Sequence, residues 1–148
     1  MVEFVDYTPD AREACLAIFD RNCPEFFAPN ERPDYADFLR RADDGYRLCR
    51  IDGRVVGAFG LMAAGAPGDA HLNWILISPD AQGGGIGRAI IAEVAASARE
   101  REVRTVHIAA SHRSAPFFAR FGAEETGRKD DGWGPGMHRV DMVWRLDV

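Results

Sequence analysis

The stretch SPDAQGGGIGRAI, residues 78–90, decides how the rest of the chain is interpreted. Glycine is the poorest ordinary residue for a helix, yet glycines occupy positions 83–85 and 87, directly before an apolar, alanine-rich segment. A helix N-terminus carries unpaired N–H groups and a partial positive charge, and glycines let a phosphate approach that backbone closely. The stretch therefore predicts a pyrophosphate-binding loop between a strand and a helix.

Two common nucleotide-binding motifs do not fit this loop. A P-loop requires Gly-Lys followed by Ser or Thr, and no Gly-Lys pair occurs in the chain. A dinucleotide fingerprint requires a third small residue, and that place falls on Ile90 or Arg88, depending on which glycine begins the count. The pattern that does fit is Gln-x-x-Gly-x-Gly, formed by Gln82, Gly85 and Gly87.

This pattern resembles the central motif of the GNAT superfamily of acyl-CoA-dependent N-acetyltransferases, whose loop and helix start hold the pyrophosphate of coenzyme A. The similarity extends over ILISPDAQGGGIGRAII, residues 75–91, including Pro79. The resemblance implies an α/β fold of the GNAT type over residues 1–148, as a single domain. In that fold a mixed central sheet of about six to seven strands is flanked by about four helices. It also implies acetyl-CoA as cosubstrate and no metal.

A second segment, SHRSAPFFARFGAE at residues 111–124, looks like the fourth-helix motif of the same family. Ser111 stands where that motif commonly has Asn, and Phe118 stands where it commonly has Tyr. The family's Tyr often protonates the leaving thiolate, which Phe118 cannot do. Two functions therefore stay open, namely acetyl transfer and acyl-CoA binding by a non-catalytic regulatory module.

The two motifs together define the expected coenzyme site. By resemblance, the residues expected to contact acetyl-CoA are Leu76, Ile77, Gln82, Gly83, Gly84, Gly85, Ile86, Gly87, Arg88, Ser111, Ser114 and Phe118.

Hydrophobic periodicity predicts secondary structure that matches this fold. Strands are expected over 2–7, the hairpin 45–65, 70–78 and 103–110, with a final strand or strand pair that includes 137–146. Helices are expected over 10–22, 33–43, 88–102 and 114–122. Asp52-Gly53 suits a type I′ turn within the hairpin, and the two later strand–helix–strand crossovers are expected to be parallel.

Acetyl transfer to an amine needs a base or a water relay, because an ammonium with a pKa of about 10.4 stays protonated at pH 7. Side-chain alternation along 70–78 would place His71 and Asn73 on the same face as Ile77. Since the family's base often lies on this strand, His71 is the expected base, with Asn73 or an ordered water as the alternative. Backbone N–H groups of Leu76 and Ile77 are expected to bind the developing oxyanion.

No motif identifies the acceptor. We expect a primary amine on a small molecule, a peptide or a protein terminus. It would be attacked directly in a ternary complex, because no Gly-x-Ser-x-Gly motif occurs. Two loops, 22–34 and 129–138, are expected to border the acceptor pocket, and the second carries Trp133. Trp74 is expected on the strand face opposite His71, as a packing residue.

Composition excludes other classes of protein. The net charge of −5 argues against nucleic-acid binding, and no apolar run reaches the ~20 residues that a membrane helix needs. The N-terminus lacks the basic and apolar plan of a signal peptide, so a cytoplasmic location is expected. Members of the family often dimerise, and the sequence does not decide between a monomer and a homodimer.

Overall fold

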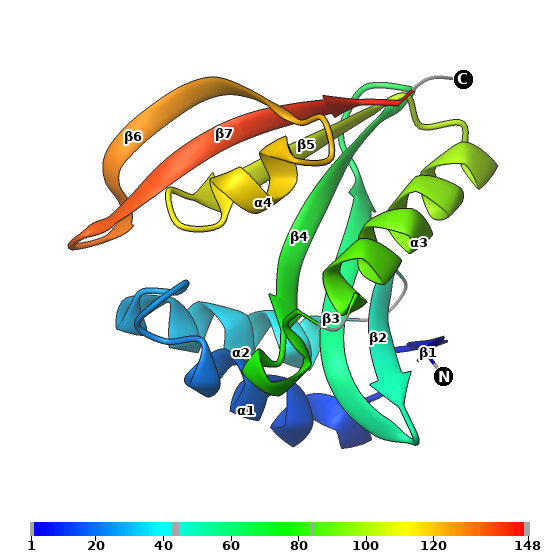
Figure 1. Ribbon diagram of the computed structural model, residues 1–148, viewed down its shortest axis with the longest axis vertical. Helices are drawn as coiled ribbons and strands as arrows, with labels where there is room; N and C mark the ends of the chain where they lie inside the picture. The colour runs from blue at the N-terminus through cyan, green and yellow to red at the C-terminus, as the bar shows by residue number, and fades with distance from the viewer. Residues whose placement is uncertain (1, 43–44, 84, 147–148) are drawn as a thin grey trace.

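A seven-stranded mixed sheet forms the centre of the computed structural model, which describes residues 2–42, 45–83 and 85–146 (Figure 1). In space the strands follow the order β1-β2-β3-β4-β5-β7-β6. The strands are β1 (Val2–Asp6), β2 (Tyr46–Ile51), β3 (Arg54–Ala63), β4 (Asp69–Ile77), β5 (Thr105–Ser111), β6 (Glu124–Gly134) and β7 (Met137–Arg145). The α/β class and the mixed sheet expected from the sequence are confirmed.

Four α-helices flank the sheet in the described part of the chain. They are α1 (Arg12–Arg21), α2 (Arg32–Arg41), α3 (Ile86–Glu100) and α4 (Ala115–Ala119). Pro9, Pro29 and Pro79 begin short 3₁₀ turns before α1, before α2 and before the glycine-rich loop, because proline presets φ for a first turn and lacks the N–H. The four predicted helices are confirmed, although α4 is shorter than 114–122, and the chain turns at Gly122 with φ 103°.

The first four strands form an antiparallel meander, which contains the predicted hairpin of β2 and β3. Asp52 and Gly53 join β2 to β3 with φ values of 52° and 77°, and two positive values are what a type I′ turn requires. The adjacent residues Ala58 and Phe59 belong to two different hydrophobic clusters, which lie on opposite faces because strand side chains alternate. Helices α1 and α2 cover one face, and α3 covers the other.

Strands β4 and β5 are parallel neighbours for only part of their length. Their pairing runs from Asp69 opposite Thr105 to Leu72 opposite Ile108. Beyond these residues the strands diverge, with β4 on one side and β5 with α4 on the other (Figure 1). Backbone groups of β4 after Leu72 therefore have no strand partner on the β5 side.

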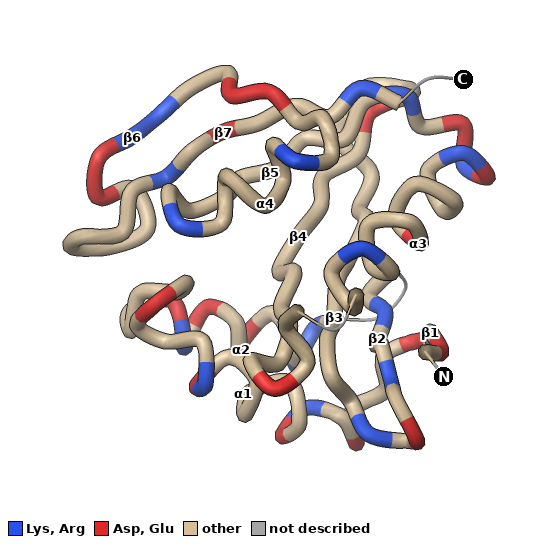
Figure 2. The backbone as a smooth tube through the Cα atoms, viewed as in Figure 1, with Lys and Arg blue, Asp and Glu red and all other residues tan. Residues whose placement is uncertain are grey.

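The C-terminal part differs from the prediction in one respect. Strand β6 reaches Gly134, so most of 129–138, expected as a loop, is strand. Charged residues follow one another along β6 (Figure 2), and most of its residues are exposed, so no hydrophobic alternation marks it as a strand. Pairing with β7 supplies the strand conformation. Both later crossovers return the chain in the parallel direction, but β7 inserts between β5 and β6.

Candidate active site

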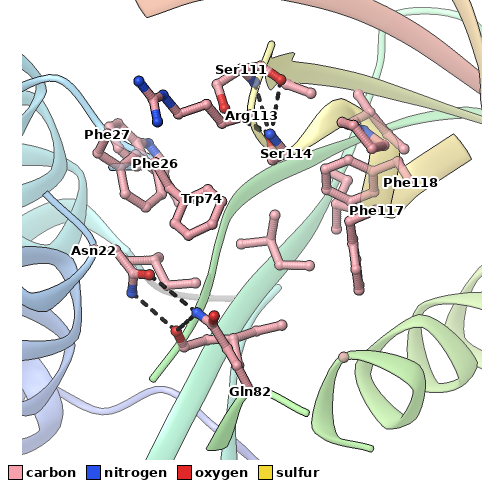
Figure 3. A pocket seen from close by; sticks show the side chains of 18 of the residues that line it. Asn22, Phe26, Phe27, Trp74, Gln82, Ser111, Arg113, Ser114, Phe117 and Phe118 are labelled. Carbon is pink, nitrogen blue, oxygen red and sulfur yellow. Dashed lines mark hydrogen bonds between the residues drawn. The ribbon is translucent and has the colours of Figure 1, made fainter. Parts of the chain in front are cut away.

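A cavity of about 1100 Å³ fills the opening between β4 and β5. Residues from the loop after α1, β4, the glycine-rich loop, the start of α3, β5 and α4 line it. Figure 3 shows Phe26, Phe27 and Trp74 on one side of the cavity and Phe117 and Phe118 on the other. The opening thus has a mainly apolar wall on both sides, with polar groups at separate points.

The glycine-rich loop leads into α3 with two residues in the left-handed region. Gly83 has φ 86°, and Gly85, which is the N-cap of α3, has φ 85°. No atom lies within 4 Å of a Cβ built on either residue, so backbone conformation and not space requires glycine there. Both residues line the cavity, while Gly84 lies outside the described residues.

Gly87 is required for a different reason. A Cβ on Gly87 would lie 2.7 Å from Cε1 and 3.0 Å from Cζ of Phe117. Helix α3 therefore contacts the Phe117 ring of α4 through this glycine, and a larger residue would require that ring to move. Ile86, the first residue of α3, is 3% exposed and belongs to the core rather than to the cavity lining.

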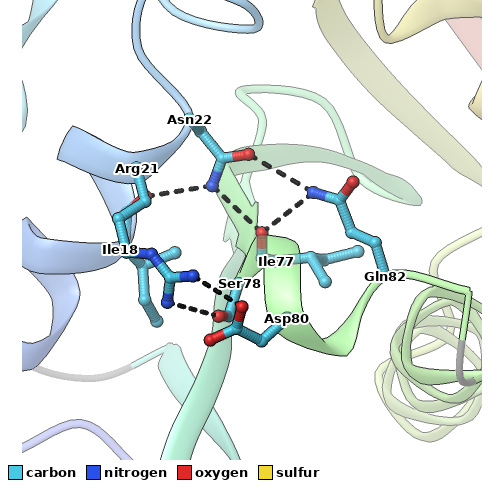
Figure 4. Close-up of polar contacts among 7 residues, drawn as sticks. All are labelled: Ile18, Arg21, Asn22, Ile77, Ser78, Asp80 and Gln82. Atoms are coloured by element: carbon cyan, nitrogen blue, oxygen red, sulfur yellow. Dashed lines mark hydrogen bonds and ion pairs between the residues drawn. The ribbon is translucent and has the colours of Figure 1, made fainter.

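Gln82 is held by protein groups on the side of α1. Its Nε2 donates to the carbonyl of Ile77 at 3.2 Å and to Oδ1 of Asn22 at 3.3 Å, and Asn22 Nδ2 donates to the same Ile77 carbonyl at 3.0 Å (Figure 4). Asn22 also donates to the carbonyl of Ile18 and is only 4% exposed. Nothing in the sequence indicated that Asn22 supports the glycine-rich loop, because a lone Asn at a helix C-terminus looks like an ordinary cap.

An ion pair strengthens the same junction. Arg21 contacts Asp80 at 2.7 Å and also donates to the hydroxyl of Ser78 at 3.3 Å. Both partners belong to the segment between β4 and the glycines, so the end of α1 is tied to the glycine-rich loop by two separate sets of contacts.

The backbone groups of Leu76 and Ile77 point in opposite directions. Ser78 donates its N–H to Val56 of β3, and pairing in an antiparallel ladder alternates, so the N–H of Leu76 is directed toward β3. The backbone of Ile77 is directed away from β3, as the contacts of its carbonyl with Asn22 and Gln82 show. Of the two expected oxyanion donors, only Ile77 has its N–H on the open side.

A β-bulge in β4 changes which side chains share a face. Ala58 pairs with Leu76, but Gly60 pairs with Asn73, so Trp74 and Ile75 together lie opposite Phe59. Trp74 has φ 46°, and the hydroxyl of Tyr46 donates to its carbonyl at 2.8 Å. Sequence alternation could not foresee this extra residue, which a bulge inserts on one strand only.

The expectation that His71 and Asn73 share a face with Ile77 is therefore wrong. His71 pairs with Met62 and Asn73 with Gly60, on the face of Ala58, whereas Ile77 pairs with Gly57 on the other face. The expectation that Trp74 lies on the face opposite His71 is also wrong. Trp74 packs against Tyr35 and Phe27 on the face that α1 and α2 cover, which is also the face of His71.

His71 lies outside the cavity. It is exposed, and its ring is 5.4 Å from that of His107, which in turn lies 3.4 Å from Asp69. Asn73 does line the cavity. His71 is therefore not placed to contact a group bound in the cavity directly, and its role as a base stays a prediction.

Ser111, Ser114 and Phe118 lie together at the β5 side. The two serine hydroxyls are 3.1 Å apart, and each also accepts from the backbone N–H of the other residue, at 3.0 and 3.1 Å. Phe118 is 3% exposed and forms part of the apolar wall. The serines thus fix the entry into α4, while the expected contact with the pantetheine arm stays a prediction.

The charged residues that line the cavity are one acid and three bases, namely Glu31, Arg88, Arg113 and Arg120. Arg88 is exposed in the first turn of α3, next to the glycines. Glu31, at the start of α2, is 6% exposed, and burial raises the pKa of its carboxyl to about 7. In the described residues no group of three or more His, Cys, Asp or Glu side chains is arranged to hold a metal ion.

The fold and the glycine-rich helix start define an acyl-CoA-dependent transferase. A model of the acetyltransferase (GNAT) family matches residues 12–123. The chain therefore belongs to the GNAT family, whose members transfer an acetyl group from acetyl-CoA, and the resemblance seen in the sequence is confirmed. No curated protein matches the chain, and among the described residues no helix is long and apolar enough to cross a membrane.

Solved structures with low sequence identity share the fold. Ribosomal-protein-S18-alanine N-acetyltransferase from Escherichia coli is 17% identical, with a TM-score of 0.80 over 100% of this chain and 96% of that chain. Ard1 from Thermoplasma volcanium is 14% identical, with a TM-score of 0.82 over 99% of both chains. N-acetylglutamate synthase from Neisseria gonorrhoeae, complexed with coenzyme A and N-acetyl-glutamate, is 16% identical, with a TM-score of 0.77 over 100% of this chain and 36% of that chain.

Proposed function

We propose that the protein transfers the acetyl group of acetyl-CoA to a primary amine by direct attack within a ternary complex. The observation that carries this proposal is the cavity between β4 and β5, which joins the glycine-rich start of α3 to a region with aromatic side chains and one acid. Such a cavity can hold the coenzyme and an acceptor together. Holding both reactants in place lowers the entropic barrier, and no nucleophilic side chain is needed.

Coenzyme binding is assigned to the start of α3. In this proposal the backbone around Gly83, Gly85 and Gly87 binds the pyrophosphate, favoured by the helix dipole, and Arg88 adds a positive charge. Ser111 and Phe118 border the pantetheine arm from the β5 side. Gln82 acts indirectly, because its contacts with Asn22 and Ile77 hold the loop in place.

In the chemical step the amine nitrogen attacks the thioester carbonyl carbon. The acceptor ammonium first gives one proton to water at the cavity wall beside Asn73, because only the neutral amine can attack. A C–N bond then forms, the C–S bond breaks, coenzyme A leaves as a thiolate, and the acylated nitrogen loses its second proton to the same water. The N–H of Ile77 is the proposed donor to the carbonyl oxygen. A thiol has a pKa of about 8.5, so its thiolate leaves readily near neutral pH, and Phe118 in place of a proton donor is compatible with turnover.

The release of free thiol from acetyl-CoA, measured with a panel of primary amines, tests this function. We expect amine-stimulated release, and a rise of Tm with coenzyme A because a ligand of the native state stabilises it. A rise of Tm without amine-stimulated release would instead support a non-catalytic acyl-CoA-binding module. A rise with ATP or NAD but not with coenzyme A would contradict both functions.

A further inference from the structure

Glu31 is a buried acid that lines the cavity. It ends the turn before α2, far along the chain from the glycine-rich loop. Its Oε2 accepts a hydrogen bond from the N–H of Ala28 at 2.8 Å, and the residue is 6% exposed. The neighbouring Arg32 is used elsewhere, since it pairs with Asp20 at 2.7 Å. In the described part of the chain no ion pair reaches Glu31. A buried carboxylate without a cation is unfavourable, and a cation supplied by a ligand would offset that penalty.

Aromatic side chains form the wall on the same side of the cavity. Phe27 stacks on Trp74 with ring centroids 6.2 Å apart, and on Phe19 at 4.9 Å. Phe26 and Phe27 face across the cavity toward α4 (Figure 3). These rings are partly buried without any ligand, and they offer an apolar surface to the body of an acceptor and π-faces to a cation.

The tip of the β6–β7 hairpin closes this end of the cavity. Asn30 Nδ2 donates to the carbonyl of Trp133 at 2.7 Å, and the indole Nε1 of Trp133 donates to the carbonyl of Ala110 at 2.9 Å. The turn before α2, which ends at Glu31, is therefore held against the hairpin, and the hairpin is in turn held against β5. The acid has a fixed position, as a binding group requires.

We propose that Glu31 binds the ammonium group of the acceptor, and that the acceptor is a primary amine on an apolar, preferably aromatic, body that lies against Phe26, Phe27 and Trp74. This inference rests on the proposed function and adds the substrate class. The charged groups around Glu31 agree with it. Burial raises the pKa of Glu31 most, and the negative charge of Asp34 of α2 raises it further. Cys23 of the preceding loop lies close enough that the charge of Glu31 raises the pKa of the Cys23 thiol. Neither supplies a positive charge, and Arg113, which lines the same cavity, forms no ion pair with Glu31 in the described residues. A cationic ligand would supply the missing partner.

If Glu31 only stabilised the fold, Glu31→Gln would leave amine binding unchanged. Its hydrogen bond with Ala28 caps the 3₁₀ turn before α2, and Glu31→Gln keeps that bond because the amide oxygen of Gln also accepts. The substitution removes only the charge. Glu25→Gln, on the exposed part of the same loop, is the matched control.

The experiment measures steady-state acetyl transfer to 2-phenylethylamine and to ethanolamine, and calorimetric binding of 2-phenylethylamine to the protein saturated with coenzyme A. We expect 2-phenylethylamine to have a kcat/KM at least ~10-fold above that of ethanolamine. We expect Glu31→Gln to raise its KM and Kd by at least ~10-fold, as the loss of a hydrogen bond to a charged group does. The KM for acetyl-CoA should stay unchanged in Glu31→Gln, and the Glu25→Gln variant should behave as the wild type does.

Two results would overturn the inference. One is an unchanged amine KM and Kd in Glu31→Gln, and the other is equal efficiency with ethanolamine, either of which leaves the proposed acetyl transfer intact. If instead calorimetry shows Glu31-dependent amine binding while no amine is acetylated, the inference holds and the proposed catalytic function fails.

Discussion

The two ends of the cavity are built in different ways. The coenzyme end, where we propose that the pyrophosphate binds, centres on one continuous stretch, 75–91, in which strand, loop and helix follow each other. The acceptor end combines the loop after α1, the bulge of β4 and the tip of the β6–β7 hairpin. A continuous site leaves a motif in the sequence, whereas an assembled site leaves only scattered residues. The difference explains why the coenzyme is identified by family and the acceptor only by proposal.

The largest loss of coenzyme A binding is expected from a substitution at the start of α3. Gly87→Val places a side chain where Phe117 lies 2.7 Å from the new Cβ, and overpacking of this kind destabilises by roughly 1–3 kcal/mol. We expect the coenzyme-A-dependent rise of Tm to disappear. The double variant Gly87→Val with Phe117→Ala removes the clash and should recover the folded-state stability. A full thermal shift in Gly87→Val alone would remove the start of α3 from the site.

The acceptor end should respond to pH through Glu31. Its pKa is raised from about 4.5 to about 7 in the folded protein, so the folded state binds more protons than the unfolded state between these values. The contribution of Glu31 to the free energy of unfolding is therefore fully present below about pH 4.5 and is lost as pH rises through about 7, by on the order of 3 kcal/mol. Urea unfolding of wild type and Glu31→Gln measures this. The wild type should lose stability relative to the variant over that range, and a constant difference would contradict the raised pKa.

The junction between the two ends should give an intermediate effect. Asn22→Ala removes two donors and one acceptor from a buried site, which destabilises by roughly 1–2 kcal/mol. We expect the KM for acetyl-CoA to rise, because Gln82 and the loop lose their support. Gln82→Ala, at an exposed side chain, should change stability much less. An equal loss of stability in both variants would show that Asn22 is not the centre of the junction.

Phe118→Tyr places a hydroxyl on the apolar wall. Because a thiolate is already a fair leaving group, we expect kcat to change by about tenfold at most, or ~1.4 kcal/mol. The measurement compares kcat of the wild type and Phe118→Tyr with a good acceptor at saturating acetyl-CoA. A thousandfold change in either direction would show that departure of the thiolate limits the reaction.

His71→Ala should have the smallest effect. The side chain is exposed and lies outside the cavity, and surface substitutions usually change stability by no more than ~0.5 kcal/mol. We expect an unchanged kcat/KM at pH 7 and at pH 9. A deficit at pH 7 that disappears at pH 9 would restore His71 as a base and contradict the geometry of the bulge.

The sequence predicted those features that depend on local pattern. The hairpin at Asp52-Gly53, the helices and the glycine-rich loop each carry their own signal in turn chemistry or periodicity. The bulge at Trp74 could not be predicted, because an inserted strand residue is defined by the partner strand. Strand β6 was hidden for a related reason, since an exposed, charged edge strand shows no alternation.

The same limit applies to the site. Gln82, Gly83 and Gly85 were found from a motif, but Asn22 and Glu31 acquire meaning only through burial and partners that other segments supply. His71 was misplaced because alternation was extended through a residue that breaks it.

The hydrogen bond between Asn30 and Trp133 joins residues 103 positions apart. Closing a long loop carries an entropic penalty that must be met before the contact forms, and such distant pairings are slow to form during folding. The contacts that fix the glycine-rich loop span shorter separations, such as 60 positions between Gln82 and Asn22. We therefore expect a refolding chain to fix the glycine-rich loop before the β6–β7 hairpin docks on Asn30, so that an early folding species recognises the nucleotide before it can discriminate between amines.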